Sequence, residues 1–150
     1  MTVAGNPKQD FGIRKVPLFS VVPLRVLAGV ALAMMEGARK YGAFNYRVVG
    51  TIVASVYTDG AARHIAQFCE GEDHDTESKA GLHHLDKAIA SLIVLRDAIL
   101  RGNWEDDRPP RSDPSWITQA NQTASMLVDS FPTPVAPYTQ IGLLEPSTDE

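Results

Sequence analysis

Apolar side chains recur at spacings of three and four residues from Leu24 onward, which is typical of a helix with one buried face. The stripe consists of Leu27, Val30, Ala31, Met34, Ala38 and Tyr41. Pro23 precedes it, and proline is tolerated where a helix begins because the first backbone N–H groups need no partner within the helix. Gly42 follows it and can end a helix. We therefore expect an irregular arm over residues 1–23 and a helix from Leu24 to about Gly42.

The middle of the chain carries two more helical patterns. The first covers Thr51–Glu70, and its residues expected to be buried are Ile52, Val53, Val56, Tyr57, Ile65 and Phe68. The second runs from Ser78, a capping residue, to about Leu100, with a core stripe of Leu85, Leu92, Leu95 and Ile99. No segment alternates apolar and polar residues for long enough to predict a sheet. The fold class expected is all-α.

The composition changes after Arg101, because seven of the ten prolines lie between Pro109 and Pro146. A fourth helix from about Asp113 to Ser130 is the only regular element expected there, and the last twenty residues have the composition of an extended tail. We expect one domain over residues 1–150. Its core covers about residues 20–100, and residues 101–150 add a helix and the tail.

Composition and charge narrow the functional classes. The chain has 150 residues, 44% of them apolar, and a net charge of −4, which argues against nucleic acid as a partner. A phosphate ligand would need a metal ion or a local cluster of Lys and Arg. Pro17, Pro23 and Arg25 interrupt the apolar stretch Val16–Met35, so no membrane span is expected. With Cys69 as the only cysteine, a cytoplasmic protein is the best interpretation.

Five carboxylates lie within the eight residues from Glu70 to Glu77, the most unusual passage of the chain. Crowded carboxylates raise one another's pKa values unless a cation lies among them, and hard oxygen ligands suit Mg²⁺ or Mn²⁺. Glu70 and Asp73 also have a Glu-x-x-Asp spacing, which brings two side chains to one side of a helix. An acidic loop that merely keeps the protein soluble is an equally good interpretation of the residues alone.

Other charged residues are open to the same two interpretations. Glu36 and Lys40 are one helical turn apart, and Asp59 and Arg63 share a face with Glu70, so each set could be a solvated surface or a wall for metal and phosphate. His84 and Lys87 share a face at the start of the third predicted helix, which is a reasonable place for a phosphate contact. His64 is expected to be a packed, hydrogen-bonded histidine. There is no phosphate-binding P-loop motif, no paired Cys-x-x-Cys for zinc and no Gly-x-Ser-x-Gly motif.

Taken in order, several short motifs resemble those of one family. They are Val22-Pro23-Leu24, Glu36 to Gly42, Asn45-Tyr46-Arg47, Arg63-His64, Glu70 to Asp75, Gly81 to His84, and Lys87 to Asp97. Their order and spacing resemble the phage dATP/dGTP diphosphohydrolases, a branch similar to the MazG-like all-α NTP pyrophosphohydrolases. The likeness is greatest to the MazZ-type enzymes of phages that replace adenine by 2-aminoadenine. It covers about residues 10–100.

The resemblance implies a MazG-like helical bundle with a proline-rich C-terminal extension, assembled as a dimer or tetramer. It implies conversion of dGTP, or alternatively GTP or dATP, to the monophosphate and pyrophosphate, and the dGMP would supply 2-aminoadenine nucleotide synthesis in the host cytoplasm. The superfamily carries Glu-x-x-Glu and then Glu-x-x-Asp on adjacent helices. Arg39 stands where the second glutamate after Glu36 would be, whereas Glu70 and Asp73 keep the second motif.

From the resemblance and the residues together we expect two or more Mg²⁺ or Mn²⁺ ions. The expected metal ligands are Glu36, Glu70, Asp73 and Asp59, and the expected catalytic carboxylates are Glu36, Glu70 and Glu72. The expected substrate-binding residues are Lys40, Asn45, Arg63, His84 and Lys87. A metal-bound water would be the nucleophile, oriented by a carboxylate, while the cationic side chains offset charge on the leaving pyrophosphate.

Two other functions are compatible with the sequence. His64, His74-Asp75 and Asp86 follow the order of the ligands in HD-type phosphohydrolases, which release triphosphate rather than pyrophosphate. A non-catalytic helical oligomer that binds nucleotide, or a phage protein through its proline-rich tail, would leave every dNTP intact. Analysis of the reaction products distinguishes these two functions from the diphosphohydrolase.

Overall fold

The computed structural model describes residue 8 and residues 12–141. The chain divides into two units, residues 1–108 and residues 109–150. All of the buried side chains among the described residues belong to the first unit. The predicted irregular arm is corrected at residues 8 and 12, which are helical, while residues 13–23 contain neither helix nor strand and residues 1–7 and 9–11 lie outside the described residues.

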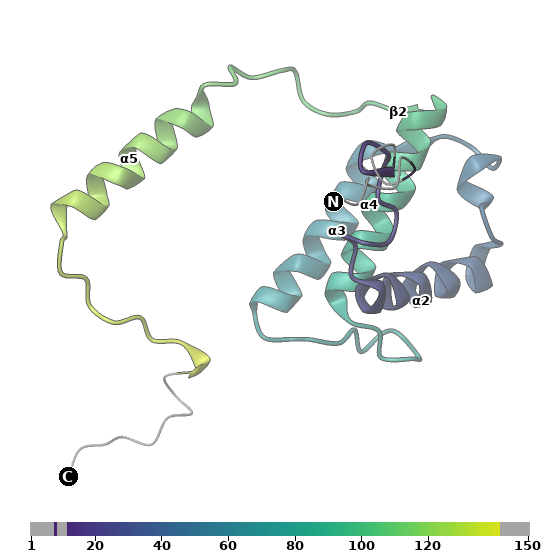
Figure 1. Ribbon diagram of the computed structural model, residues 1–150, viewed down its shortest axis with the longest axis horizontal. Coiled ribbons are helices and arrows are strands. Elements are labelled where there is room, and N and C mark those ends of the chain that lie inside the picture. The colour runs from purple at the N-terminus through teal and green to yellow at the C-terminus, as the bar shows by residue number, and fades with distance from the viewer. Residues whose placement is uncertain (1–7, 9–11, 142–150) are drawn as a thin grey trace, which may run out of the picture. The chain divides into compact units, whose positions relative to one another are not determined.

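The described part of the first unit is built mainly from the helices α2 (Leu24–Tyr41), α3 (Ala54–Cys69) and α4 (His84–Arg101) (Figure 1). α4 packs against both of the others, and more extensively against α3. The predicted limits of the first helix are confirmed: Pro23 precedes it with a φ of −65°, and Gly42 ends it with a φ of 92° that a side chain with a Cβ would resist. Among the described residues, none of the helices has the length and hydropathy of a membrane-spanning segment.

Small side chains let these helices approach one another closely. Ala54 and Ala61 of α3 and Ala88 and Ala98 of α4 are each at most 3% exposed. In α2, a Cβ at Gly29 would overlap the carboxylate of Asp86, so a larger residue would force the Asp86 side chain to move where α2 crosses the start of α4. Larger apolar side chains fill the remaining space in two clusters. The first contains Tyr46, Ile52 and Leu95, and the second contains Val30.

A short sheet corrects the expectation that the fold contains no strands. β1 (Ile52–Val53) pairs in parallel with β2 (Trp104–Glu105), with Ile52 opposite Trp104. β1 leads into α3 and β2 follows α4, so the strand pair joins the start of one helix to the end of the other. Two residues are too few to produce a detectable alternation, which is why the sequence pattern missed them.

The structure also corrects two helix starts. α3 begins at Ala54 rather than Thr51, because the preceding residues belong to β1. α4 begins at His84 rather than Ser78. The ring of His83 caps it, accepting a hydrogen bond from the N–H of Leu85 at 3.1 Å, while the Ser78 hydroxyl donates elsewhere. Side chains expected on a buried face are instead exposed at Leu27, Ala31, Tyr41, Val56, Ile65, Phe68 and Leu92.

The second unit contains α5 (Trp116–Ser130), which confirms a fourth helix but moves its start from Asp113. The Asp113 carboxylate accepts a hydrogen bond from the N–H of Ser115, just before the helix. None of the side chains of α5 is buried. Residues 131–139 contain neither helix nor strand. Of the predicted extended tail, residues 142–150 lie outside the described residues.

One ion pair fixes the connection between α2 and β1. The 3-10 helix η1 (Asn45–Arg47) lies in this connection, and the Arg47 guanidinium donates two hydrogen bonds to the carboxylate of Asp97 on α4, at 2.8 and 2.9 Å. The Asn103 amide also donates to the carbonyl of Tyr46 at 3.1 Å. A bidentate pair sets both position and orientation, so η1 is held in one place on α4.

The Asp97→Ala variant should therefore be less stable than the wild-type protein. We expect a loss of about 1 kcal/mol in the free energy of unfolding, since both partners are partly exposed and water screens the pair. The pair Asp106–Arg108 offers a matched control, because it is local and exposed. Urea denaturation should show a smaller loss for Asp106→Ala, and equal losses in the two variants would contradict this role of Asp97.

Candidate functional site

A cavity of about 460 Å³ lies among α2, α3, α4 and the segment 42–46. Alanines, Met34, Met35 and Val94 give part of its lining, and two other kinds of side chain stand among them. The charged or titratable ones are Glu36, Lys40, His64 and Lys87, and the aromatic ones are Tyr41, Phe44, Tyr46 and Tyr57. Asn45 lines it as well. Cationic groups attract phosphate and aromatic faces attract flat rings, so one cavity offers contacts to both parts of a nucleotide.

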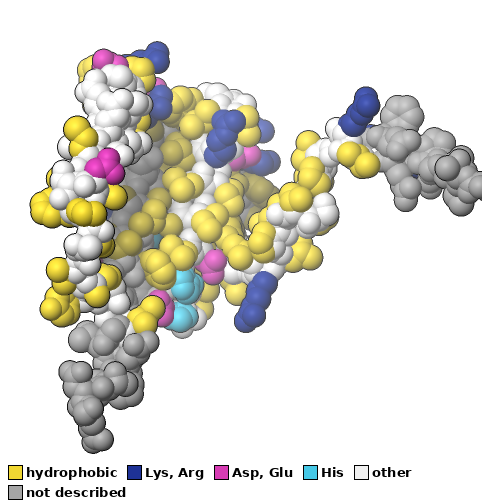
Figure 2. Space-filling model, turned by 60° about the vertical axis from the view of Figure 1, so that its left-hand side comes forward, with side chains coloured by type: hydrophobic (Ala, Val, Ile, Leu, Met, Phe, Trp, Pro, Cys, Tyr) yellow, Lys and Arg dark blue, Asp and Glu magenta, His cyan; other side chains and the backbone are white. Residues whose placement is uncertain are grey.

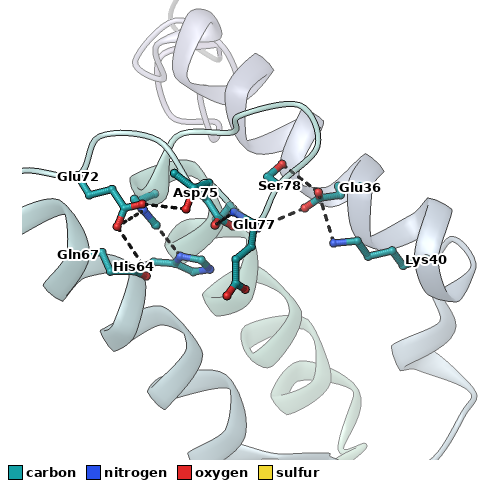
Figure 3. A network of polar contacts seen from close by, with 11 residues as sticks. Glu36, Lys40, His64, Gln67, Glu72, Asp75, Glu77 and Ser78 are labelled. Atoms are coloured by element: carbon teal, nitrogen blue, oxygen red, sulfur yellow. Dashed lines mark hydrogen bonds and ion pairs between the residues drawn. The ribbon is translucent and has the colours of Figure 1, made fainter.

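Glu36 of α2 receives three polar contacts at the edge of this cavity (Figure 3). The Ser78 hydroxyl donates a hydrogen bond to it at 2.9 Å, and the ammonium groups of Lys40 and Lys87 each lie 3.3 Å from its oxygens. Burial alone would raise the pKa of the Glu36 carboxyl. The hydrogen bond from Ser78 and the charge of Lys87 outweigh that effect and lower the pKa below its ordinary value. Glu36 is therefore ionised at neutral pH.

Lys87 pairs with a second carboxylate, that of Asp75, which is only 4% exposed. Burial lowers the pKa of the Lys87 ammonium group, but the hydrogen bond and charge of Asp75, together with Glu36, raise it overall. For Asp75, burial raises the pKa, while Lys87 and the N–H of Glu77 lower it overall. One ammonium group thus contacts two carboxylates from different parts of the chain, with Lys87 on α4, Glu36 on α2 and Asp75 in the loop before α4.

The backbone of this loop explains why Asp75 points inward. Gly71, with a φ of 95°, turns the chain at the end of α3. The N–H of Asp75 then donates to the carbonyl of Leu82, and the N–H of His84 donates to the carbonyl of Asp73, at 2.8 and 2.9 Å. These two bonds fold the acidic segment back onto the start of α4. Glu70 and Asp73 remain exposed, and only the carboxylate of Asp75 is buried.

Two histidines form a hydrogen-bonded pair at the wall of the cavity. The Nδ1 atoms of His64 and His84 are 2.8 Å apart, so one ring donates and the other accepts. His84 is completely buried, and its Nε2 lies 3.6 Å from an oxygen of Glu72, with no hydrogen-bond partner among the described residues. Burial lowers the pKa of His64, and the charge of Lys87 lowers it further. A neutral His64 is therefore held at the cavity wall by a buried neighbour.

The predicted site residues divide into two groups. Glu36, Lys40, Asn45 and Lys87 line the same cavity, although they come from different segments. The others lie outside its lining: Asp59, Arg63, Glu70 and Asp73 are exposed, Glu72 is partly exposed, and His84 is buried against His64. The predicted hydrogen bonding of His64 is confirmed, and it lines the cavity as well.

Sequence reasoning did not assign Asp75 and Ser78 to this site. Asp75 was one of five acids in a crowded segment, and Ser78 had the position of a helix cap. Asp75 contacts Lys87, which is 12 positions away, and Ser78 contacts Glu36, which is 42 positions away. A local pattern carries no signal for such distant partners.

The arrangement of these side chains indicates whether they could bind a divalent cation. Within residue 8 and residues 12–141, no three His, Cys, Asp or Glu side chains are grouped so that they could hold a metal ion by themselves. Among the described residues, the predicted ligands therefore form no such group. The HD-type set forms none either, because His64 bonds to His84 and Asp75 bonds to Lys87. Glu36 lines the cavity, whereas Asp75 lies outside its lining and is paired with Lys87. Mg²⁺ is commonly held by one or two carboxylates together with substrate phosphates and water, so Glu36 fits an ion that arrives with a triphosphate.

The fold and the site define a small helical protein whose cavity combines charged and aromatic side chains. Residues 5–108 match a family model described as dATP/dGTP diphosphohydrolase, N-terminal. The match covers more than half of the chain, and the protein belongs to this family, as the sequence motifs predicted. The matched segment ends at the residue where the first unit of the structure ends. No curated protein and no solved structure matches the chain.

Replacing Lys87 by Met should destabilise the protein in a pH-dependent way. The pKa values of Glu36 and Asp75 lie below their ordinary values of 4.5 and 3.8, so their contribution to stability is present above about pH 4.5 and is lost as the pH falls through the lowered values. Without Lys87 two ionised groups lose their buried partner. We expect a loss of about 2 kcal/mol at pH 7 that shrinks below pH 4.

Chemical denaturation at a series of pH values measures this difference. Lys79 is an exposed lysine of the same loop, so Lys79→Met is the matched control and should show no such pH dependence. If the loss caused by Lys87→Met were the same at pH 3 and pH 7, the buried ion pairs would not be its origin.

Proposed function

We propose that the protein hydrolyses a purine deoxynucleoside triphosphate, with dGTP as the leading substrate and dATP or GTP as alternatives, to the monophosphate and pyrophosphate. The observation that carries the proposal is the cavity, in which Glu36, Lys40 and Lys87 share one space with Phe44 and other aromatic rings. A triphosphate joined to a base needs both kinds of contact. Membership of a family named for dATP/dGTP diphosphohydrolase gives the reaction class.

The residues of the cavity have distinct parts in this proposal. Lys40 and Lys87 bind the phosphates and offset the negative charge that develops on the pyrophosphate as it leaves. Glu36, ionised and hydrogen-bonded, orients the attacking water and can accept its proton. His64 is neutral and offers a further polar contact from the opposite helix. Because Lys87 already lies between two carboxylates, its ammonium group is fixed in position before a substrate arrives.

A bound Mg²⁺ or Mn²⁺ would lower the pKa of a coordinated water and neutralise phosphate charge. Glu36 is the carboxylate that lines the cavity and can act as a ligand there. The resemblance to the MazG-like enzymes supports a larger set that holds two or more ions, with Glu70, Asp73 and Asp59 as additional ligands and Glu72 as a catalytic carboxylate. It also supports Arg63 and His84 as substrate-binding residues. In the present structure His84 would act only through His64, which it contacts directly.

We also propose a homo-oligomer, a dimer or a tetramer. One side of α4 exposes a row of large apolar side chains, with fractional exposures of 37% at Ile89, 43% at Leu92, 40% at Ile93 and 69% at Leu100. The space-filling view likewise shows hydrophobic side chains spread over the face of the molecule that it presents (Figure 2). Exposed apolar area of this kind is a common feature of subunit interfaces.

In a phage, dGMP from this reaction would supply the synthesis of a 2-aminoadenine nucleotide.

Glu36→Gln should lower the rate of pyrophosphate release from dGTP by at least about a hundredfold, because the amide cannot accept a proton and holds a cation weakly. The assay measures pyrophosphate with Mg²⁺ and with Mn²⁺ over all eight common NTPs and dNTPs. Glu105→Gln is the matched control, since Glu105 is exposed and lies outside the cavity lining. Unchanged turnover in Glu36→Gln would exclude Glu36 from the reaction.

The Glu70→Gln variant tests whether the larger set of metal ligands, which includes Glu70, takes part in the reaction. Loss of turnover in this variant with retained folding would support the larger set, and normal turnover would leave Glu36 as the carboxylate concerned. The identity of the product tests the alternatives: triphosphate would indicate an HD-type reaction, and intact dNTPs in every condition would indicate a protein that only binds nucleotide.

A further inference from the structure

The turn after α2 contains an unusual backbone conformation. Phe44 has a φ of 57° and a ψ of 20°, and it is the only residue other than glycine with a positive φ among the described residues. A side chain with a Cβ is strained in this left-handed conformation, and glycine would relieve the strain. Gly42, two residues earlier, has a φ of 92° and avoids the cost in this way. The chain therefore keeps a large aromatic residue where glycine would fit better.

The ring of Phe44 does not explain this strain by filling the core. It is 60% exposed and lines the cavity. Its aromatic neighbour, the buried Tyr46, lies 6.3 Å away between ring centroids and is tilted by 53°, so the two rings do not stack face to face. Strained residues of this kind are concentrated at ligand-binding sites, where the position of the side chain matters more than its cost.

Neighbouring residues hold the Phe44 ring in a defined position. The guanidinium of Arg47 lies over the ring, 4.8 Å from its centroid. Two hydrogen bonds to Asp97 fix that guanidinium on α4. One face of the ring is therefore covered by a cation, and a flat ligand can stack on the other face. The positive charge of Arg47 also attracts a ligand that carries negative charge close to its flat ring.

We propose that Phe44 is the stacking residue for the base of the nucleotide, with Asn45 beside it to bond the edge of the base or the sugar. Both side chains line the cavity that also contains Glu36, Lys40 and Lys87, so a ligand stacked on Phe44 can place its phosphates among these charges. A purine has a larger π surface than a pyrimidine, so we expect stacking on Phe44 to be stronger with a purine. This inference rests on the proposed function for the identity of the ligand, and it goes beyond that function by assigning the base-binding residue.

The experiment measures binding rather than turnover. Isothermal titration calorimetry with Mg²⁺ gives the dissociation constants of α,β-imido-dGTP, α,β-imido-dCTP and inorganic tripolyphosphate. Phe44→Ala removes the ring and keeps the strain, Phe44→Gly removes both, and Phe44→Tyr keeps the ring. Stacking predicts about tenfold weaker binding of the dGTP analogue to the Ala and Gly variants, with the Tyr variant close to the wild type. Binding of tripolyphosphate should be unchanged in all of them.

Thermal unfolding of the same proteins shows whether the conformation is strained. Phe44→Gly should melt at a higher temperature than Phe44→Ala although both bind the analogue weakly. Val48→Ala is the matched control in the same segment, because Val48 is exposed and lies outside the cavity lining. Tight binding of α,β-imido-dGTP by Phe44→Gly, or an equal loss of tripolyphosphate binding, would overturn the proposal. Binding that follows this pattern in a protein without hydrolysis would refute the proposed function and leave the stacking residue established.

Discussion

The ammonium group of Lys87 lies between the carboxylates of Glu36 and Asp75, and this contact joins α2, the loop before α4 and α4 itself. Burial disfavours the ionised form of all three groups, and both carboxylates rely on Lys87, while Lys40 and Ser78 also contact Glu36. The loop must fold back to bring Asp75 inward, and α2 must cross α4 closely enough for Glu36 to reach Lys87. The same arrangement places charged groups along the wall of the cavity.

The aromatic lining of the cavity depends on a separate anchor. Arg47 and Asp97 fix η1 on α4, and the strained turn before η1 directs Phe44 toward the cavity. The charged side chains therefore come mainly from the helices, whereas Phe44 and Asn45 come from a short connection. Such a division suits a nucleotide, because phosphate recognition relies on fixed charge and base recognition on the shape of a surface.

Local patterns predicted most of the fold and part of the site. The spacing of apolar residues gave the four helices, and proline and glycine gave the limits of α2. The motif Glu36 to Gly42 and the position of Lys87 gave residues that do line the cavity. The roles of Asp75 and Ser78 were not predictable, since both depend on partners far along the chain. β1 and β2 are too short for a periodic pattern, and the conformation of Phe44 leaves no trace in the order of residues.

The proposed function requires that the cavity among α2, α3 and α4 binds the triphosphate. A crystal structure of the protein with α,β-imido-dGTP and Mn²⁺ tests it most directly, since anomalous scattering locates the manganese. We expect the metal and the phosphates beside Glu36 and Lys87 and the guanine ring against Phe44. Nucleotide and metal bound instead along the exposed face of Asp59 and Glu70, with the cavity empty, would contradict the account.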